Sequence, residues 1–198
     1  LYMLVAQAVK ASRIFTDGDT DDMEAVTGTV YGQIVSEKEN IVLIGMPGSG
    51  KSTVGKALAK ALGRTFIDTD EEIVQRAGKP IPDIFAQEGE AGFRDLETQV
   101  VREIANASTG CIIATGGGAI LRDENVRALK RTGKLYFLDR ALDALIPTSD
   151  RPLASTVDAI RKRYHERYDR YLAVCDKRIV IDEILEHTVS NIRKDFFA

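Results

Sequence analysis

The sequence has little cysteine, little histidine, no long apolar run and no excess of positive charge, and each shortage excludes a class of protein. Among 198 residues, 27 Lys and Arg stand against 30 Asp and Glu, which leaves a net charge of −3. This balance argues against a protein held on nucleic acid mainly by phosphate contacts. No apolar stretch approaches the ~20 residues of a membrane span, and the first residues lack the basic-then-apolar layout of a signal peptide. We therefore expect a cytoplasmic protein without a nucleic-acid or membrane partner.

The scarce residues also offer no metal site and no disulfide framework. Cys111 and Cys175 lie far apart and fit no metal-ligand spacing, so we expect both to be reduced thiols. His165 and His187 are isolated, and surface or structural roles are the better interpretation. With 44% hydrophobic and 29% charged residues, a chain of this length can form one domain with an appendage and bury a core without disulfides.

Residues 1–39 differ in pattern from the rest, and we interpret them as an appendage and linker. Apolar side chains near the start share one helical face and predict a short amphipathic helix. They are Leu1, Leu4, Val5, Ala8 and Val9. The acidic run at 17–22 is spaced like a calcium loop, but Asp22 stands where such a loop needs glycine and Gly28 where it needs a bidentate glutamate. A solvated acidic linker is the better interpretation.

From residue 40 to the end, apolar runs suited to buried parallel strands alternate with helical stretches. Strands are expected at 41–44, 65–67, 111–114, 135–138 and 179–181. Helices are expected at 51–62, 70–77, 90–106, 123–131, 156–172 and 183–195, with Gly63 and Gly133 at helix ends. This alternation predicts an α/β domain over residues 40–198, a five-stranded parallel sheet with helices on both faces.

Residues 45–52 read GMPGSGKS and match the phosphate-binding pattern G-x-x-x-x-G-K-[S/T] at every fixed position. An apolar strand precedes the loop and an apolar-periodic helix follows it, as phosphate binding requires, because loop N–H groups and the helix N-terminus act together. In this motif Lys51 neutralises the β and γ phosphates and Ser52 supplies a hydroxyl to Mg²⁺. The sequence therefore predicts a P-loop fold that binds a Mg²⁺–nucleoside triphosphate through Gly48, Ser49, Gly50, Lys51, Ser52 and Thr53.

A P-loop alone does not separate a small-molecule kinase from a GTPase, a motor or an ATP-gated regulator, but carboxylates after the second strand favour a kinase. This strand ends in FIDTD, and alternate carboxylates there project from the edge of the sheet where ligands bind. Asp68 is placed to reach Mg²⁺ through water, and Asp70 can face an acceptor hydroxyl. The alternative for Asp70 is a helix N-cap.

Two further features point to an anionic acceptor. Arg94, near the start of a long helix, can bind an anion while Glu97 at i+3 orients it, although an exposed ion pair is the alternative. Three glycines at 116–118 follow the middle strand and suggest close approach of the backbone to a ligand, with a plain loop as the alternative.

Together these motifs resemble the shikimate kinase family. The resemblance rests on GMPGSGKSTVGKALA, F-x-D-x-D, G-E-x-x-F-R and T-G-G-G, followed by R-P-L at 151–153 and R-x-x-x-Y at 167–171, all in family order. It covers residue 41 to the C-terminus. It implies transfer of the γ-phosphoryl group of ATP to the 3-hydroxyl of shikimate, on the route to chorismate and aromatic amino acids.

The resemblance also implies roles for individual residues on the acceptor side. Asp70 binds the acceptor hydroxyls and serves as general base. Arg94 and Arg167 clamp the substrate carboxylate, and Gly117 adds a backbone contact. Arginine suits this task because its planar fork can donate two parallel hydrogen bonds to a carboxylate.

On the nucleotide side, the resemblance gives Lys51 and Arg151 the stabilisation of the transferring phosphoryl group, and Arg151 also binds ATP. Ser52 holds Mg²⁺ with Asp68 beside it. The polar segment 148–152 is expected to be a lid that closes over the phosphates.

The sequence departs from the family pattern at two places. Asp169 stands where the family often has proline, and Arg163 and Arg170 are alternatives to Arg167 as the second clamp arginine. The stretch 141–147 lacks the arginine that many members place against adenine.

Two other functions are compatible with a P-loop. The nearest rival enzyme is another small P-loop kinase, for example of gluconate or of a nucleoside monophosphate, and a sugar acceptor without an acid group would leave the paired arginines and the second aspartate without their obvious purpose. An ATP-binding regulatory module that has lost catalysis would require a lesion, and Lys51, Ser52, Asp70 and Arg151 are all present.

The first residues, LYMLVAQA, resemble the C-terminal helix of shikimate dehydrogenases over about ten positions. We therefore expect the chain to be the kinase part of a multifunctional dehydrogenase–kinase fusion. Gln7 would correspond to a dehydrogenase substrate contact, and the apolar face of Leu1, Leu4, Val5 and Ala8 is expected to lie on the kinase surface or on a neighbouring chain.

Overall fold

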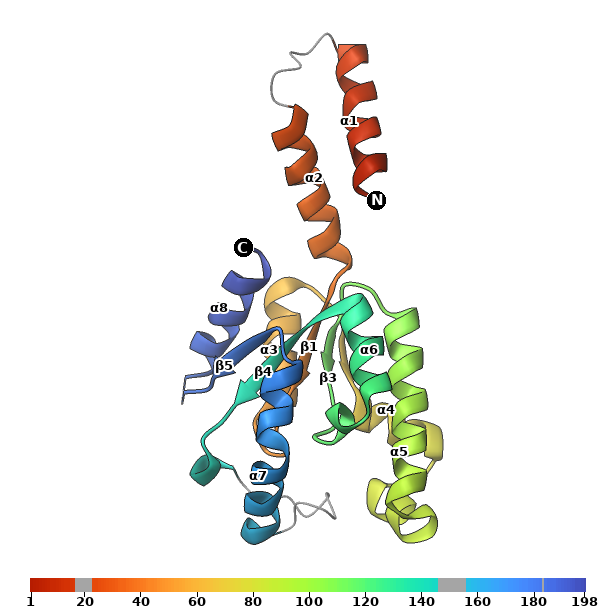
Figure 1. Ribbon diagram of the computed structural model, residues 1–198, viewed down its shortest axis with the longest axis vertical. Coiled ribbons are helices and arrows are strands. Elements are labelled where there is room, and N and C mark those ends of the chain that lie inside the picture. Colours follow the sequence, from red (N-terminus) through yellow and green to blue (C-terminus); the bar gives the residue numbers. More distant parts are fainter. Residues whose placement is uncertain (17–22, 146–155, 183) are drawn as a thin grey trace. The chain divides into compact units, whose positions relative to one another are not determined.

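The computed structural model describes residues 1–16, 23–145, 156–182 and 184–198 (Figure 1). The chain divides into two compact units, Leu1–Lys38 and Glu39–Ala198, and each is described by itself. Arg151 and the expected lid at 148–152 lie outside the described residues. In the part of the chain that is described, no helix is both long enough and apolar enough to cross a membrane.

The first unit is a pair of helices, α1 (Tyr2–Thr16) and α2 (Met23–Lys38), that pack on each other. Val5 is buried, and the rings of Tyr2 and Tyr31 meet edge to face at 5.3 Å. Leu1 and Leu4 are each 63% exposed, and Ala8 is exposed as well. That their face lies on the kinase surface or on a neighbouring chain stays a prediction.

Among the α1 side chains whose burial is described, Val5, Ala6 and Val9 are buried or half-buried, and their helical spacing places them on one side of the helix. Helix α2 was not predicted as a helix at all. Gly28 and Gly32 lie within it, and glycine costs about 1 kcal/mol relative to alanine in a helix.

The second unit is built on a five-stranded parallel sheet in the order β2-β3-β1-β4-β5. The strands are β1 (Asn40–Ile44), β2 (Phe66–Asp68), β3 (Ile112–Ala114), β4 (Gly133–Asp139) and β5 (Lys177–Val180). All five were predicted within two residues at each end. Because all strands run in one direction, their carboxyl ends meet at a single edge, where crossover loops can form a site.

Helices cover both faces of this sheet, as predicted (Figure 1). They are α3 (Lys51–Leu62), α4 (Thr69–Ala77), α5 (Ile81–Ala107), α6 (Asp123–Thr132), α7 (Val157–Val174) and α8 (Leu185–Phe196), with short 3-10 turns η1 (Ala119–Leu121) and η2 (Leu142–Ala144). Val42 and Ile44 of β1 belong to the core beneath α4–α7, whereas Ile41 and Leu43 belong to the core beneath α3 and α8. This alternation is the period of a strand buried on both sides.

One predicted helix start needs correction, whereas both predicted helix-ending glycines follow their helices. Helix α5 begins at Ile81, earlier than the predicted residue 90, and Gly89 interrupts it with φ 71° and ψ −177°. Gly133 does follow α6, but its backbone is extended rather than left-handed, and a Cβ there would lie 2.6 Å from the carbonyl oxygen of Asn40. The glycine is therefore required by close approach to β1. Gly63 ends α3 in the left-handed conformation, as predicted.

Candidate active site

The P-loop connects β1 to α3 at the carboxyl edge of the sheet. Gly48 and Gly50 have positive φ angles of 78° and 93°, which glycine adopts without strain. The Lys51 ammonium is buried and donates hydrogen bonds to the carbonyl oxygens of Gly45 and Met46, each at 2.9 Å. Lys51 is thereby held at the mouth of the loop, where a polyphosphate chain would meet its charge.

Ser52 and Asp68 come together from two elements. The Ser52 hydroxyl, at the start of α3, donates to Asp68 Oδ2 at 2.6 Å. Asp68 Oδ1 accepts from the backbone N–H of Asp70 at 3.0 Å, so Asp68 is the N-cap of α4. The N-cap interpretation of Asp70 is therefore wrong, since Asp70 lies in the first turn of the helix. Both oxygens of Asp68 are fixed by these bonds, next to the phosphate loop.

A cavity of about 480 Å³ opens beside these residues. It is lined by Ser52, Asp68, Asp70, Glu71, Val74, Gln75, Pro80, Ile81 and Pro82. Asp70 thus shares one cavity with the residues of the phosphate side. The arrangement places a carboxylate of α4 where an acceptor hydroxyl can approach it.

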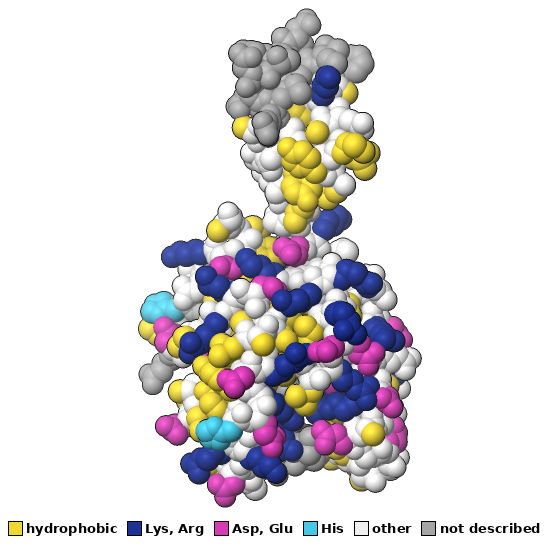
Figure 2. Space-filling model, in the orientation of Figure 1, with side chains coloured by type: hydrophobic (Ala, Val, Ile, Leu, Met, Phe, Trp, Pro, Cys, Tyr) yellow, Lys and Arg dark blue, Asp and Glu magenta, His cyan; other side chains and the backbone are white. Residues whose placement is uncertain are grey.

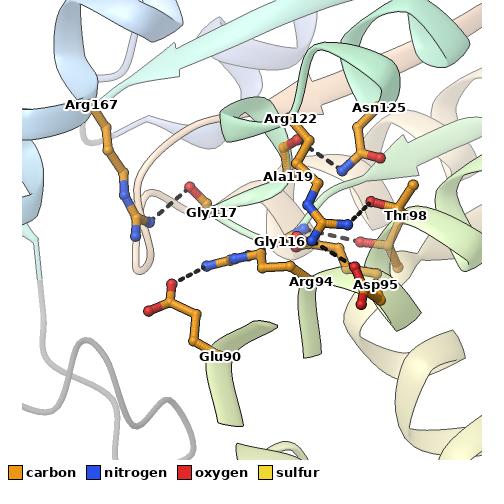
Figure 3. Close-up of polar contacts among 12 residues, drawn as sticks. Glu90, Arg94, Asp95, Thr98, Gly116, Gly117, Ala119, Arg122, Asn125 and Arg167 are labelled. Atoms are coloured by element: carbon orange, nitrogen blue, oxygen red, sulfur yellow. Dashed lines mark hydrogen bonds and ion pairs between the residues drawn. The ribbon is translucent and has the colours of Figure 1, made fainter. Parts of the chain in front are cut away.

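Arg94 and Glu97 form a buried ion pair on α5. Arg94 Nη1 lies 2.7 Å from Glu97 Oε2, and its Nη2 lies 3.3 Å from Glu90 Oε1 (Figure 3). Arg94 is 8% exposed and Glu97 is fully buried, so the exposed-pair alternative is wrong. Burial raises the pKa of Glu97, while the nearby Arg94 charge acts against that rise. Glu97 Oε1 has no hydrogen-bond partner among the described residues.

Arg167 approaches the same place from α7. It is 6% exposed, and its Nη1 donates to the Gly117 carbonyl oxygen at 3.1 Å (Figure 3). Burial lowers the pKa of Arg167, and the charges of Arg94 and Arg163 act in the same direction. Arg170, the alternative on the same helix, instead donates to the Ile120 carbonyl and pairs with Asp123. The geometry favours Arg167 as the second arginine at the site.

The three glycines lie among these groups, and each is in close contact with one of them. A Cβ on Gly116 would lie 2.6 Å from Asp70 Oδ1 and 2.9 Å from Glu97 Oε1. A Cβ on Gly118 would lie 2.3 Å from both terminal nitrogens of Arg94. The glycines therefore let the two carboxylates and the arginine approach the backbone closely.

Sequence reasoning missed two groups that hold this loop. The Thr69 hydroxyl oxygen accepts the Gly116 N–H at 3.0 Å, and the Tyr171 hydroxyl donates to the Gly117 carbonyl at 2.5 Å. Tyr171 stood in a recognised motif, but nothing in that motif indicated its partner, because 54 residues separate the two.

A second cavity, of about 170 Å³, lies on the other side of the P-loop. It is lined by Ser49, Gly50, Thr53, Val54, Arg140, Ile181, Asp182, Leu185 and Thr188. The hydroxyls of Ser49 and Thr188 are buried here and have no hydrogen-bond partner among the described residues. Arg140 directly follows β4, one residue before the stretch 141–147, which lacks the arginine expected against adenine.

A parallel sheet with a P-loop at its carboxyl edge, carboxylates in a cavity beside the loop, and two buried arginines at the neighbouring glycine segment are typical of a small-molecule kinase of the P-loop class. Residues 47–195 match the family model for shikimate kinase. The chain belongs to the shikimate kinase family.

Individual relatives agree with the family match. The chain is 40% identical over 161 residues to a shikimate kinase of Clostridium botulinum (strain Eklund 17B / Type B), a match that covers 79% of this chain and 96% of that protein. Among solved structures, a shikimate kinase from Acinetobacter baumannii in complex with shikimate aligns with a TM-score of 0.76 at 33% identity, covering 82% of this chain and 95% of that one. A shikimate kinase from Bacteroides thetaiotaomicron aligns with a TM-score of 0.73 at 32% identity, covering 81% and 99%.

Proposed function

We propose that this member of the shikimate kinase family, whose reaction is the ATP-dependent phosphorylation of shikimate, uses Asp70 as the base that activates the 3-hydroxyl of shikimate. The observation that carries the proposal is the position of Asp70. Its Oδ1 lies against Gly116, next to the buried Arg94–Glu97 pair, and its cavity also contains Ser52 and Asp68. The Asp70 carboxylate therefore lies next to both the residues proposed to bind the acceptor and those proposed to bind the phosphates.

In the proposed mechanism, Arg94 and Arg167 bind the carboxylate of shikimate, and Gly117 adds a backbone contact. Binding the ring at this end presents the hydroxyl to Asp70, which accepts its proton as the new oxygen–phosphorus bond forms. The bond between the γ phosphorus and the bridging oxygen of ADP breaks in the same step. Phosphoryl transfer needs positioning and charge neutralisation more than covalent chemistry, and Lys51 supplies positive charge at the loop.

Arg151 completes the proposed phosphoryl site. Its role rests on the resemblance of residues 151–153 to the lid motif of the family, since these residues lie outside the described ones. In the proposal Arg151 adds positive charge to the transferring phosphoryl group, and the segment 148–152 closes over the phosphates.

The donor set beside the P-loop fits Mg²⁺. A serine hydroxyl and a carboxylate 2.6 Å apart are hard oxygen ligands, and Mg²⁺ keeps most of its water while binding only one or two protein groups. In the proposal Ser52 binds the metal directly and Asp68 through water. The ion would neutralise charge on the β and γ phosphates.

We further propose that the base of ATP occupies the smaller cavity, with Arg140 packed against the ring. The cavity adjoins Gly50 and Thr53 of the P-loop, and its lining includes Ser49 and Thr188, whose buried hydroxyls have no hydrogen-bond partner among the described residues. Arg140→Ala should weaken ATP binding by about 3- to 30-fold, the range of a cation–π contact, and leave the binding of tripolyphosphate unchanged. Arg193→Ala, an exposed charge on α8 outside the cavity, is the control. Equal losses for both ligands would place Arg140 on the phosphates instead.

A finer proposal concerns residues 1–39, which we propose to be an appendage and linker beside a kinase domain at 40–198. We propose that α1 is the last helix of a shikimate dehydrogenase domain fused to the kinase. Its support is the resemblance of residues 1–8, together with the apolar side chains that α1 exposes. Leu1, Met3 and Leu4 are all more than 60% exposed, and hydrophobic side chains are visible on this unit in Figure 2. The fusion is tested by measuring the mass of the natural polypeptide. A polypeptide whose N-terminal residue is Leu1 would contradict it.

The position of phosphorylation tests the proposed chemistry. With ATP and Mg²⁺, the full chain should convert shikimate to a product whose new phosphate is on the 3-oxygen, identified by phosphorus–proton NMR coupling. A shikimate analogue without the 3-hydroxyl should bind but receive no phosphate. A product phosphorylated on another oxygen would contradict the placement of Asp70.

A further inference from the structure

The Gly117 carbonyl accepts two hydrogen bonds from α7. Arg167 Nη1 donates at 3.1 Å and the Tyr171 hydroxyl at 2.5 Å. The two side chains are four residues apart, so they share one face of the helix. The proposed mechanism uses Arg167 for the substrate carboxylate, but it gives no task to Tyr171.

Tyr171 is held rigidly in the core. Its side chain is fully buried, and its ring stacks on Phe137 of β4 with centroids 4.9 Å apart and 7° between the planes. Burial raises the pKa of Tyr171, so the hydroxyl remains a donor at neutral pH. A rigid ring fixes the position of its hydroxyl, and the hydroxyl in turn fixes the carbonyl that it binds.

The other contacts of this peptide are with the two halves of the active site. A Cβ on Gly117 would lie 2.7 Å from Pro47 of the P-loop, and Gly118 lies against the Arg94 guanidinium. The Gly117–Gly118 peptide therefore stands between Arg94 and Arg167. Its position sets the spacing of the two arginines that are proposed to bind the substrate carboxylate.

We propose that Tyr171 is a positioning residue for carboxylate recognition, which holds the Gly117 carbonyl while Arg167 binds the substrate. The inference rests on the proposed function. Without the hydroxyl, Arg167 is the remaining donor to that carbonyl among the described residues. The buried carbonyl and the substrate carboxylate would then compete for one guanidinium, and a buried acceptor left without a donor is costly.

The test is Tyr171→Phe in the full chain, which keeps the stacked ring and removes only the hydroxyl. Calorimetry should show the Kd for shikimate rising by about 3- to 10-fold, the loss of one hydrogen bond, with a matching rise in KM. The Kd for ATP and kcat should stay near the wild-type values. The same change made after Arg167→Ala should cost little further affinity, because the competing guanidinium is gone.

Tyr136→Phe is the matched control. Tyr136 is also fully buried on β4, but it belongs to the core beneath α3 and α8, and its hydroxyl donates to Asp195 at 2.9 Å. It should lower Tm without changing the affinity for either substrate. Wild-type shikimate affinity in Tyr171→Phe, or equal losses for ATP and shikimate, would overturn the inference. A wild-type chain that neither binds nor phosphorylates shikimate would instead refute the proposed function.

Discussion

Replacing Arg94 with alanine should lower both the free energy of unfolding and the affinity for shikimate, and the two losses can be measured separately. The Arg94 guanidinium lies 2.7 Å from the carboxylate of Glu97, which is fully buried. Removing the arginine leaves that carboxylate buried without its cation, which costs about 3–5 kcal/mol of unfolding free energy. The substrate carboxylate also loses one of its two proposed cations, which should weaken shikimate binding by about 2–5 kcal/mol.

The loss of stability should depend on pH. Burial raises the pKa of Glu97, and Arg94 opposes that rise, so the pKa should move further up when Arg94 is removed. A carboxyl group whose folded pKa exceeds its unfolded pKa binds more protons when folded. Its contribution to the free energy of unfolding is therefore full below the unfolded pKa, and this contribution is lost as pH rises through the folded pKa. Urea unfolding should show the free energy of unfolding of Arg94→Ala falling further below that of wild type as pH rises above the ordinary pKa of a glutamate.

A double variant separates the two effects. Adding Glu97→Gln to Arg94→Ala removes the buried charge, so stability should recover while shikimate affinity does not. Arg122→Ala is the control, because Arg122 pairs with the exposed Asp95 outside the proposed clamp and should cost less than about 1 kcal/mol. Wild-type shikimate affinity in Arg94→Ala, or a pH-independent loss of stability that Glu97→Gln does not restore, would refute this reasoning.

Three other predictions concern the proposed base, the metal ligand and the appendage. Asp70→Asn should lower kcat by about 10²–10⁴-fold with little change in the Kd for ATP, and turnover near wild type would remove Asp70 from the role of base. Ser52→Ala should raise the Mg²⁺ concentration needed for half-maximal activity, and an unchanged requirement would contradict its role as a ligand. Deleting residues 1–36 should leave kcat and both KM values essentially unchanged, whereas a large loss of activity in a folded deletion would contradict a separate kinase domain.

The elements that sequence predicted well are those fixed by local chemistry. Helix α3 was predicted at its observed bounds, because the P-loop starts it, apolar residues repeat along it, and Gly63 ends it. The first part of α5 was missed because Pro80 and Pro82 look like helix breakers, although proline is well accepted in a first turn.

Contacts across the sheet could not be predicted from sequence. The bond between Tyr171 and Gly117 depends on how α7 lies over β4, and no spacing in the chain encodes that. Arg140 was overlooked for the same reason, since it faces the P-loop only once β4 and β5 are side by side. The motifs indicated the residues that are proposed to react. Only the fold shows which other side chains keep those residues in position.

The most direct test of the central claim is the release of ADP by the full chain, measured with shikimate, gluconate, a nucleoside monophosphate or no acceptor. ADP should form with shikimate, in equal amount to shikimate 3-phosphate, and at no more than background rate in the other three reactions. ADP release that does not need shikimate, or that is as fast with gluconate or the nucleotide, would contradict the account.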